Sequence, residues 1–308
     1  MVSKKDVKKS VAESIRKTVL GIAIIVLVCT AAYLLNAFVI EPFKHNQTGN
    51  DTTVSDESNT NTTLIDGNDD AIQAKYSALL KINPDFVGKL YISAIDETGY
   101  NVVQADDNNK YLKLGFKGET TRYGTLFVDY RNNLKEFNAN TIIYGHNMRD
   151  GSQLGSLSLY NDIENYKAYP TLDFNTIYSN HTWKIFAAFI SNGNKAQDNG
   201  YEFPYIATNF PSEAKFLEFI DEVKSRSYYT NEAVDIVPGD KILTLSTCDT
   251  VFEDARFVVM ARLVRDGEST EVDTSRAKVN ENQRFPQAWY DEMGKTNPFR
   301  NASKFTIN

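Results

Sequence analysis

Residues 241–264 read KILTLSTCDTVFEDARFVVMARLV, two apolar runs separated by a short polar stretch. The first run ends at Cys248, which Asp249 and Thr250 follow, and the second run begins at Arg256. Apolar runs of this length are typical of β-strands, and the polar stretch between them is turn-forming. A thiol at the end of a strand projects into a cleft while the sheet fixes its position. A short loop would then return Arg256 to the side of the thiol.

The rest of the chain predicts a mostly β protein. Short apolar runs separated by Gly, Asn and Asp recur from residue 87 onward, and only one long helix, over residues 211–227, interrupts the later ones. An earlier helix is predicted over Asp69–Asn83. Many strands with few helices indicate a closed β-barrel with helices on its flank. The expected strands are Val87–Ser93, Tyr111–Leu114, Thr125–Tyr130, Asn140–His146, Trp183–Ile190, Lys241–Cys248 and Arg256–Val264.

Charge is unevenly distributed along the 308 residues, whose net charge is -7. Six basic and two acidic side chains lie within residues 1–18, so the remainder of the chain is strongly acidic. An acidic body argues against a nucleic-acid partner, which would require a basic face. The 17 Tyr and 18 Phe favour a β-rich core over a helical bundle.

An uncharged run of 22 residues, VLGIAIIVLVCTAAYLLNAFVI, occupies positions 19–40. As a helix it would span roughly 33 Å, about the thickness of the hydrocarbon core of a bilayer. The basic segment 1–18 precedes it, so the N-terminus is expected in the cytoplasm and everything after residue 40 outside the cell. A cleaved signal peptide is the alternative, because Ala31 and Ala32 are small residues near the end of the run. The continuation of the apolar run through Ile40 favours a membrane anchor.

The exported part is expected to divide into three regions. Residues 41–70 are rich in Asn, Thr, Asp and Ser and predict a flexible tether, because such a segment cannot bury enough surface to order itself. Residues 71–265 hold the predicted strands and form the main domain. Residues 266–308 are polar, without a clear strand period, and no role is predicted for them.

Cys248 is the candidate nucleophile. The other cysteine, Cys29, lies within the apolar run and is interpreted as a buried apolar thiol. Most free cysteines are small buried hydrophobes, and that is the alternative for Cys248 too. The expected location outside the cell favours a function, since an unpaired thiol needs a reason to persist there.

A nucleophilic thiol needs a nearby base or cation. His146 ends an apolar strand and opens into a loop, whereas His45 lies against the expected membrane and His181 lies in a polar loop, where a solvated turn residue is expected. If the strands that carry Cys248 and His146 end at the same rim, thiol and imidazole meet. Arg256 keeps its charge and is suited to stabilising an oxyanion, although a solvated arginine is the alternative.

Together these residues resemble the motifs of sortases. Residues 244–248, TLSTC, match the TLxTC signature of that family, and Arg256 on the next strand completes it. Residues 144–148, YGHNM, are similar to the histidine motif of class B sortases. The resemblance runs from about residue 70 to 265. Within it, NPDFVG at 83–88 resembles the family's entry strand, VVQ at 102–104 a later strand, and GTLFVDY at 124–130 the strand before the histidine.

The resemblance implies an activity. The family cuts the C-terminal sorting signal of a secreted protein after a Thr, with Cys248 forming a thioester, His146 acting as acid and base, and Arg256 stabilising the oxyanion. The accepting amine would come from a peptidoglycan stem peptide or its lipid-linked precursor, so that the protein becomes anchored to the cell wall. Ser246, Tyr205 and Ile206 are the expected substrate-binding residues. No cofactor and no metal are expected.

Three other functions are alternatives to a sortase that transfers the acyl group to a peptidoglycan amine. A pilus-type sortase would use a Lys of another protein as acceptor. Another exported Cys/His peptidase is disfavoured, because L,D-transpeptidases place His and Cys almost adjacent and papain-like enzymes place Cys before His. A non-enzymatic, membrane-tethered binding module would leave Cys248 merely structural.

Overall fold

The computed structural model describes residues 63–64 and 72–308 of the chain. The basic segment 1–18, the predicted membrane span 19–40 and most of the tether 41–70 lie outside the described residues, as do Cys29 and His45, and these assignments stay predictions. Within the part of the chain that the structure describes, no helix is both long and apolar enough to span a bilayer.

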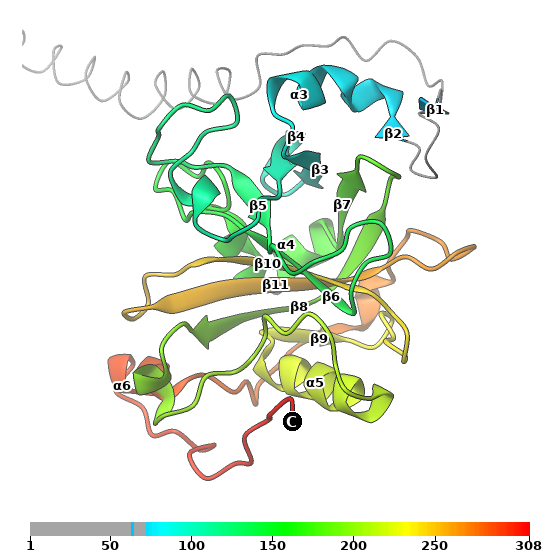
Figure 1. Cartoon of the computed structure of the whole chain (residues 1–308). Coiled ribbons are helices and arrows are strands. Elements are labelled where there is room, and N and C mark those ends of the chain that lie inside the picture. The colour runs from blue at the N-terminus through cyan, green and yellow to red at the C-terminus, as the bar shows by residue number, and fades with distance from the viewer. Residues whose placement is uncertain (1–62, 65–71) are drawn as a thin grey trace, which may run out of the picture. The chain divides into compact units, whose positions relative to one another are not determined.

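Eight strands close into a barrel in the order β10-β11-β8-β7-β3-β4-β5-β6 (Figure 1). Neighbouring strands are antiparallel except for two parallel pairs, β4 with β5 and β6 with β10. The predicted closed, mostly β barrel is therefore confirmed. The strands are β3 (Phe86–Ile92), β4 (Asp96–Val103), β5 (Leu126–Val128), β6 (Asn140–Tyr144), β7 (Thr171–Thr176), β8 (Thr182–Asn192), β10 (Ile242–Cys248) and β11 (Ala255–Leu263).

One predicted strand, Tyr111–Leu114, is wrong. The chain there forms the 3-10 helix η3 (Lys110–Leu112). Oδ1 of Asp107 accepts hydrogen bonds from the backbone N–H groups of Asn109 at 2.6 Å and Lys110 at 2.9 Å, which winds the chain into a turn. The other predicted strands are present. Strand β4 includes Val102 and Val103 of the expected strand at 102–104 but begins earlier, and β7 is an additional strand of the barrel.

The predicted helix over Asp69–Asn83 begins later than expected. Ile72–Gln73 form strand β2, which pairs with β1 (Thr63–Leu64) inside the predicted tether. The 3-10 helix η2 (Ala74–Tyr76) and helix α3 (Ser77–Ile82) follow. Gln73 is held in an extended conformation because its backbone N–H donates to the carbonyl of Ile177 at 2.7 Å.

Two hydrophobic clusters lie on the two faces of the central strands. One fills the barrel and includes Ile185, Leu245 and Val259. The other packs the outer face of β8, β10 and β11 against helix α5 (Glu213–Arg226). Strands buried on both faces read as continuous apolar runs, which is why the sequence revealed them. The predicted apolar stripe of α5 is buried here as Phe216, Phe219, Ile220 and Val223, after an N-cap at Ser212 whose Oγ accepts from the N–H of Lys215.

The remaining elements are short. Helix α4 (Ile163–Ala168) and the 3-10 helix η4 (Leu157–Asn161) place Tyr166 and Tyr160 in the barrel cluster. The 3-10 helix η5 (Lys195–Asp198) follows β8. The extension 266–308 is folded rather than featureless, because it forms η6 (Thr274–Arg276), β12 (Ala277–Val279), which pairs with β9 (Tyr229–Asn231), and α6 (Gln287–Glu292).

Candidate active site

Cys248 is the last residue of β10, and it is exposed although Ile242 to Thr247 before it are all buried. Hydrogen bonds to β6 on one side and β11 on the other fix the backbone of this strand. The thiol therefore stands at the rim of the barrel on a rigid support. A nucleophile needs this combination of accessibility and a fixed position.

His146 lies beside Cys248 because β6 and β10 run parallel and end at the same rim. Their pairing joins residues 102 positions apart, as in Asn140 with Ile242, and His146 and Cys248 are separated by the same 102 positions. Just past the ends of the strands, Asn147 Nδ2 donates to the carbonyl of Cys248 at 2.8 Å. The register thus places the backbone of His146 next to that of Cys248.

The ring of His146 is oriented by a backbone carbonyl. Its Nε2 lies 2.7 Å from the carbonyl oxygen of Leu112, at the end of η3. Because a carbonyl oxygen only accepts hydrogen bonds, Nε2 is the protonated nitrogen in this arrangement. Nδ1 is then the nitrogen that is free to exchange a proton with a substrate.

Arg256 stands on the other side of Cys248. It is the register partner of Cys248 in the β10–β11 pair and of Ser191 in the β11–β8 pair. Within the described residues, no carboxylate forms an ion pair with Arg256, and its Nη1 donates only to the carbonyl of Ala255 at 3.0 Å. Gly193 makes room for the guanidinium, since a Cβ at that position would come within 2.8 Å of Arg256 Nη2.

Of the three expected substrate-binding residues, Tyr205 and Ser246 contact each other, and Ile206 follows Tyr205 in the chain. The hydroxyl of Tyr205 lies 3.0 Å from Ser246 Oγ, and both side chains are buried, with 6% and 3% of their surface exposed. Burial raises the pKa of Tyr205, which therefore keeps its proton and remains able to donate. Ile206 is half-buried against the outer cluster, and its carbonyl accepts from Arg131 Nη2 at 3.1 Å.

A buried carboxylate that was not predicted from the sequence, Asp129, supports this region. Asp129 is fully buried and accepts hydrogen bonds from Tyr144 at 2.9 Å and from Arg131 Nη2 at 2.7 Å. Burial would raise the pKa of Asp129, but these hydrogen bonds outweigh it and leave the pKa below its usual value. Because Tyr144 ends β6 two residues before His146, the ionised Asp129 helps to fix the histidine strand.

The other described histidine lies elsewhere. His181 precedes β8, whereas Arg256 pairs near the far end of that strand. The expectation of a solvated turn residue is wrong, because the ring packs edge-on against Phe137 with centroids 4.9 Å apart. Burial lowers the pKa of His181, and Ser179 Oγ lies 2.7 Å from its Nε2.

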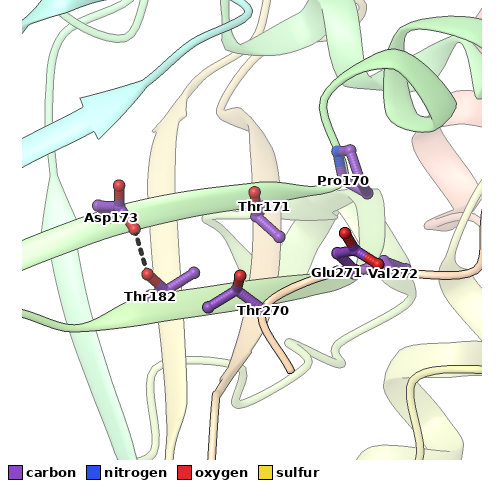
Figure 2. A pocket seen from close by; sticks show the side chains of 7 residues that line it. All are labelled: Pro170, Thr171, Asp173, Thr182, Thr270, Glu271 and Val272. Atoms are coloured by element: carbon purple, nitrogen blue, oxygen red, sulfur yellow. Dashed lines mark hydrogen bonds between the residues drawn. The ribbon is translucent and has the colours of Figure 1, made fainter. Parts of the chain in front are cut away.

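A polar hollow of about 540 Å³ also opens at that end of the barrel. Figure 2 shows its walls on β7, β8 and the segment that follows β11, with Thr182 donating to Asp173 at 2.6 Å. Its lining contains no cysteine, histidine or arginine, so the hollow is separate from the site at Cys248. The residues that line the hollow are Pro170, Thr171, Asp173, Thr182, Thr270, Glu271 and Val272.

Among residues 63–64 and 72–308, no group of three or more His, Cys, Asp or Glu side chains is arranged to hold a metal ion.

A closed barrel that carries a cysteine, a histidine and an arginine at one rim has the groups that acyl transfer requires. The family model of the sortase domain matches residues 90–264 of this chain. The chain belongs to the sortase family, in its class B, whose members are cysteine transpeptidases of the cell wall.

Related proteins support the assignment to class B sortases in both sequence and fold. The chain is 36% identical to sortase B of Listeria monocytogenes over 225 residues, which cover 72% of this chain and 86% of the relative. The crystal structure of sortase B from Bacillus anthracis superimposes with a TM-score of 0.60 at 30% identity, covering 74% of this chain and all of that one. A sortase B–substrate complex from Staphylococcus aureus gives a TM-score of 0.56 at 33% identity, over 63% of this chain and 86% of that one.

Proposed function

We propose that this chain is an exported, membrane-anchored sortase that cleaves a C-terminal sorting signal after a Thr and transfers the acyl group to a peptidoglycan amine. The observation that carries the proposal is the position of three residues at one rim of the barrel. Cys248 ends β10, Arg256 is its register partner on β11, and His146 follows the end of β6, which pairs with β10 on the other side. This arrangement supports a thiol that works between an imidazole and a guanidinium.

The first half-reaction makes a thioester. The thiol of Cys248 gives its proton to Nδ1 of His146, the resulting thiolate attacks the carbonyl carbon of the Thr, and Arg256 stabilises the oxyanion that forms. The C–N bond then breaks, and His146 gives a proton to the departing amine. Nδ1 is the nitrogen for this transfer, because Nε2 is engaged by the carbonyl of Leu112.

The second half-reaction releases the acyl group to an amine. His146 takes a proton from the incoming amine, the amine attacks the thioester carbonyl, and the C–S bond breaks to restore the thiolate. The amine belongs to a peptidoglycan stem peptide or its lipid-linked precursor. Tyr205, Ser246 and Ile206 form the wall along which the sorting peptide binds, and the substrate complex of the related Staphylococcus aureus enzyme supports a peptide partner.

The proposal is tested by mixing the full chain with sorting-type peptides of the NPxTx, xPxTG and LPxTG series and recording the intact mass. The expected result is a mass gain equal to the N-terminal peptide fragment, discharged when a stem-peptide amine is added. Discharge by a Lys-containing protein but by no stem peptide would favour the pilus-type alternative. A chain that reacts with no peptide, with or without amine, would contradict the proposal.

Arg256→Ala is expected to slow thioester formation by about 10²–10³-fold, the usual loss when an oxyanion donor is removed. Arg256→Lys keeps the positive charge but lacks the planar guanidinium, and its rate of thioester formation is expected to lie between those of the wild type and Arg256→Ala. The measurement is the single-turnover rate of adduct formation. Arg276→Ala is the matched control, because that arginine is half-exposed and pairs with Glu232 at the surface. Undiminished acylation in Arg256→Ala would remove Arg256 from the mechanism.

A further inference from the structure

The segment 193–207 leaves the barrel after β8 and contacts the candidate active site at both of its ends. At its start, Gly193 lies against the guanidinium of Arg256, with room for no Cβ between them. Near its end, the hydroxyl of Tyr205 lies 3.0 Å from Ser246 Oγ, two residues before Cys248. Contacts that fix the position of this segment therefore also fix the position of one wall of the candidate active site.

The middle of the segment is held by the C-terminal end of the chain. Oδ1 of Asp198 accepts from the backbone N–H of Gln287 at 3.0 Å, and the carbonyl of Asp198 accepts from Lys304 Nζ at 3.2 Å. The hydroxyl of Tyr201 donates to the carbonyl of Phe305 at 2.9 Å, a buried hydrogen bond across 104 positions of sequence. These bonds join two segments that have few regular elements of their own.

The ring of Phe305 completes the outer hydrophobic cluster beneath the segment. It is 9% exposed, and its centroid lies 6.2 Å from that of Phe203 and 5.9 Å from that of Phe219 on α5. Phe203 in turn precedes Tyr205, which belongs to the same cluster. Removal of the Phe305 ring would open the packing on which Phe203 and Tyr205 rest.

The residues that precede Phe305 are anchored along the way, so that the end of the chain is delivered to a defined place. Nδ2 of Asn280 donates to the carbonyl of Ser227 at 2.9 Å, and Gln283 Nε2 donates to that of Arg226 at 2.8 Å. Arg284 Nη1 donates to Glu222 Oε1 at 2.8 Å. Figure 1 shows the red end of the chain passing α6 and finishing beside α5.

We propose that residues 280–308, the C-terminal strap, position the segment 193–207 and thereby set the affinity of the enzyme for its sorting peptide. Apart from η5 (Lys195–Asp198), that segment has no regular secondary structure, so tertiary contacts decide where its ends lie. The sortase-domain match ends at residue 264, before the strap begins. The inference rests on the proposed function, because it concerns binding of the peptide along the wall formed by Tyr205 and Ser246.

The test compares full-length wild type with Phe305→Ala and Tyr201→Phe, using the peptide that acylates the wild type. Phe305→Ala is expected to raise the KM for the peptide about tenfold or more. Displacement of a substrate-positioning group by about 1 Å has effects of this size or larger, and loss of the Phe305 ring removes the packing that positions Tyr205. Tyr201→Phe removes only the hydroxyl bound to Phe305, and a rise of about two- to tenfold is expected. The rate of alkylation of Cys248 by a small iodoacetamide should remain at the wild-type value in both.

Met293→Ala is the matched control, because Met293 lies on the strap with 44% of its surface exposed. Its KM should equal that of the wild type, and Phe305→Tyr should recover most of the loss in Phe305→Ala. An unchanged KM in Tyr201→Phe, or a fall in kcat and alkylation at constant KM, would overturn the strap proposal even if Phe305→Ala fails to fold. A wild type that forms no thioester contradicts the proposed function instead, which is a different result.

Discussion

Cys248→Ala is expected to abolish thioester formation and to reduce acyl transfer by about 10⁴-fold or more, since loss of the nucleophile removes the covalent route altogether. The barrel should remain folded. Cys248 is exposed at the end of β10, and substitutions at such surface positions usually change the free energy of unfolding by no more than about 0.5 kcal/mol. The measurement is the intact mass of the variant after incubation with peptide, together with the yield of amine-linked product.

The other cysteine of the chain supplies the control. Cys29→Ala should form the thioester at the wild-type rate, because the proposed chemistry uses Cys248 alone. Alkylation followed by peptide mapping should then locate the reactive thiol in the peptide that contains Cys248. Amine-linked product from Cys248→Ala at more than a trace would exclude Cys248 as the nucleophile.

The fold could be predicted where strands are buried on both faces. Trp183–Ile190 and the two runs of residues 241–264 are continuous apolar stretches, because β8, β10 and β11 lie between the barrel interior and α5. Strand β7 (Thr171–Thr176) was missed because only alternate residues are buried and the intervening positions carry Thr171, Asp173 and Asn175. Only the end of β4, at Val102 and Val103, was expected as a strand, because its first half, Asp96 to Gly99, has the composition of a polar turn.

The candidate site could be predicted in part, because its reactive side chains follow recognisable strands. Cys248 and His146 each end an apolar run, and parallel pairing of these runs brings them together. The carbonyl of Leu112 that orients the imidazole has no signal of its own, since any residue offers a carbonyl and the contact spans 34 positions. Leu112 itself lies in the predicted strand Tyr111–Leu114, which the structure replaces by η3.

The strap could not be predicted for a related reason. Its contacts join Phe305 to Tyr201 and Gln287 to Asp198 across about 90 to 100 positions, and each is made by a residue that looks unremarkable in its local sequence. The polar composition of residues 266–308 has no clear strand period, and no element was predicted there. The hydrogen bonds of Asn280, Gln283 and Arg284 show instead that polar side chains hold the extension to backbone carbonyls and a carboxylate of the domain.

His146→Ala is expected to slow both halves of the reaction by about 10²–10⁴-fold, the usual contribution of a positioned general acid and base. The thiol remains present, so thioester formation should be detectable but slow, and discharge by the amine should be slow as well. Single-turnover mass measurements of adduct formation and discharge separate the two steps.

His181→Ala is the matched control, because His181 packs against Phe137 before β8, away from the end at which Arg256 pairs. It should keep the wild-type rates of both steps. Added imidazole should restore part of the lost rate in His146→Ala, since it can occupy the space that the side chain leaves, and it should not affect His181→Ala. If His146→Ala discharged the thioester at the wild-type rate, the proton transfer would have to come from another group, and the assignment of His146 would be wrong.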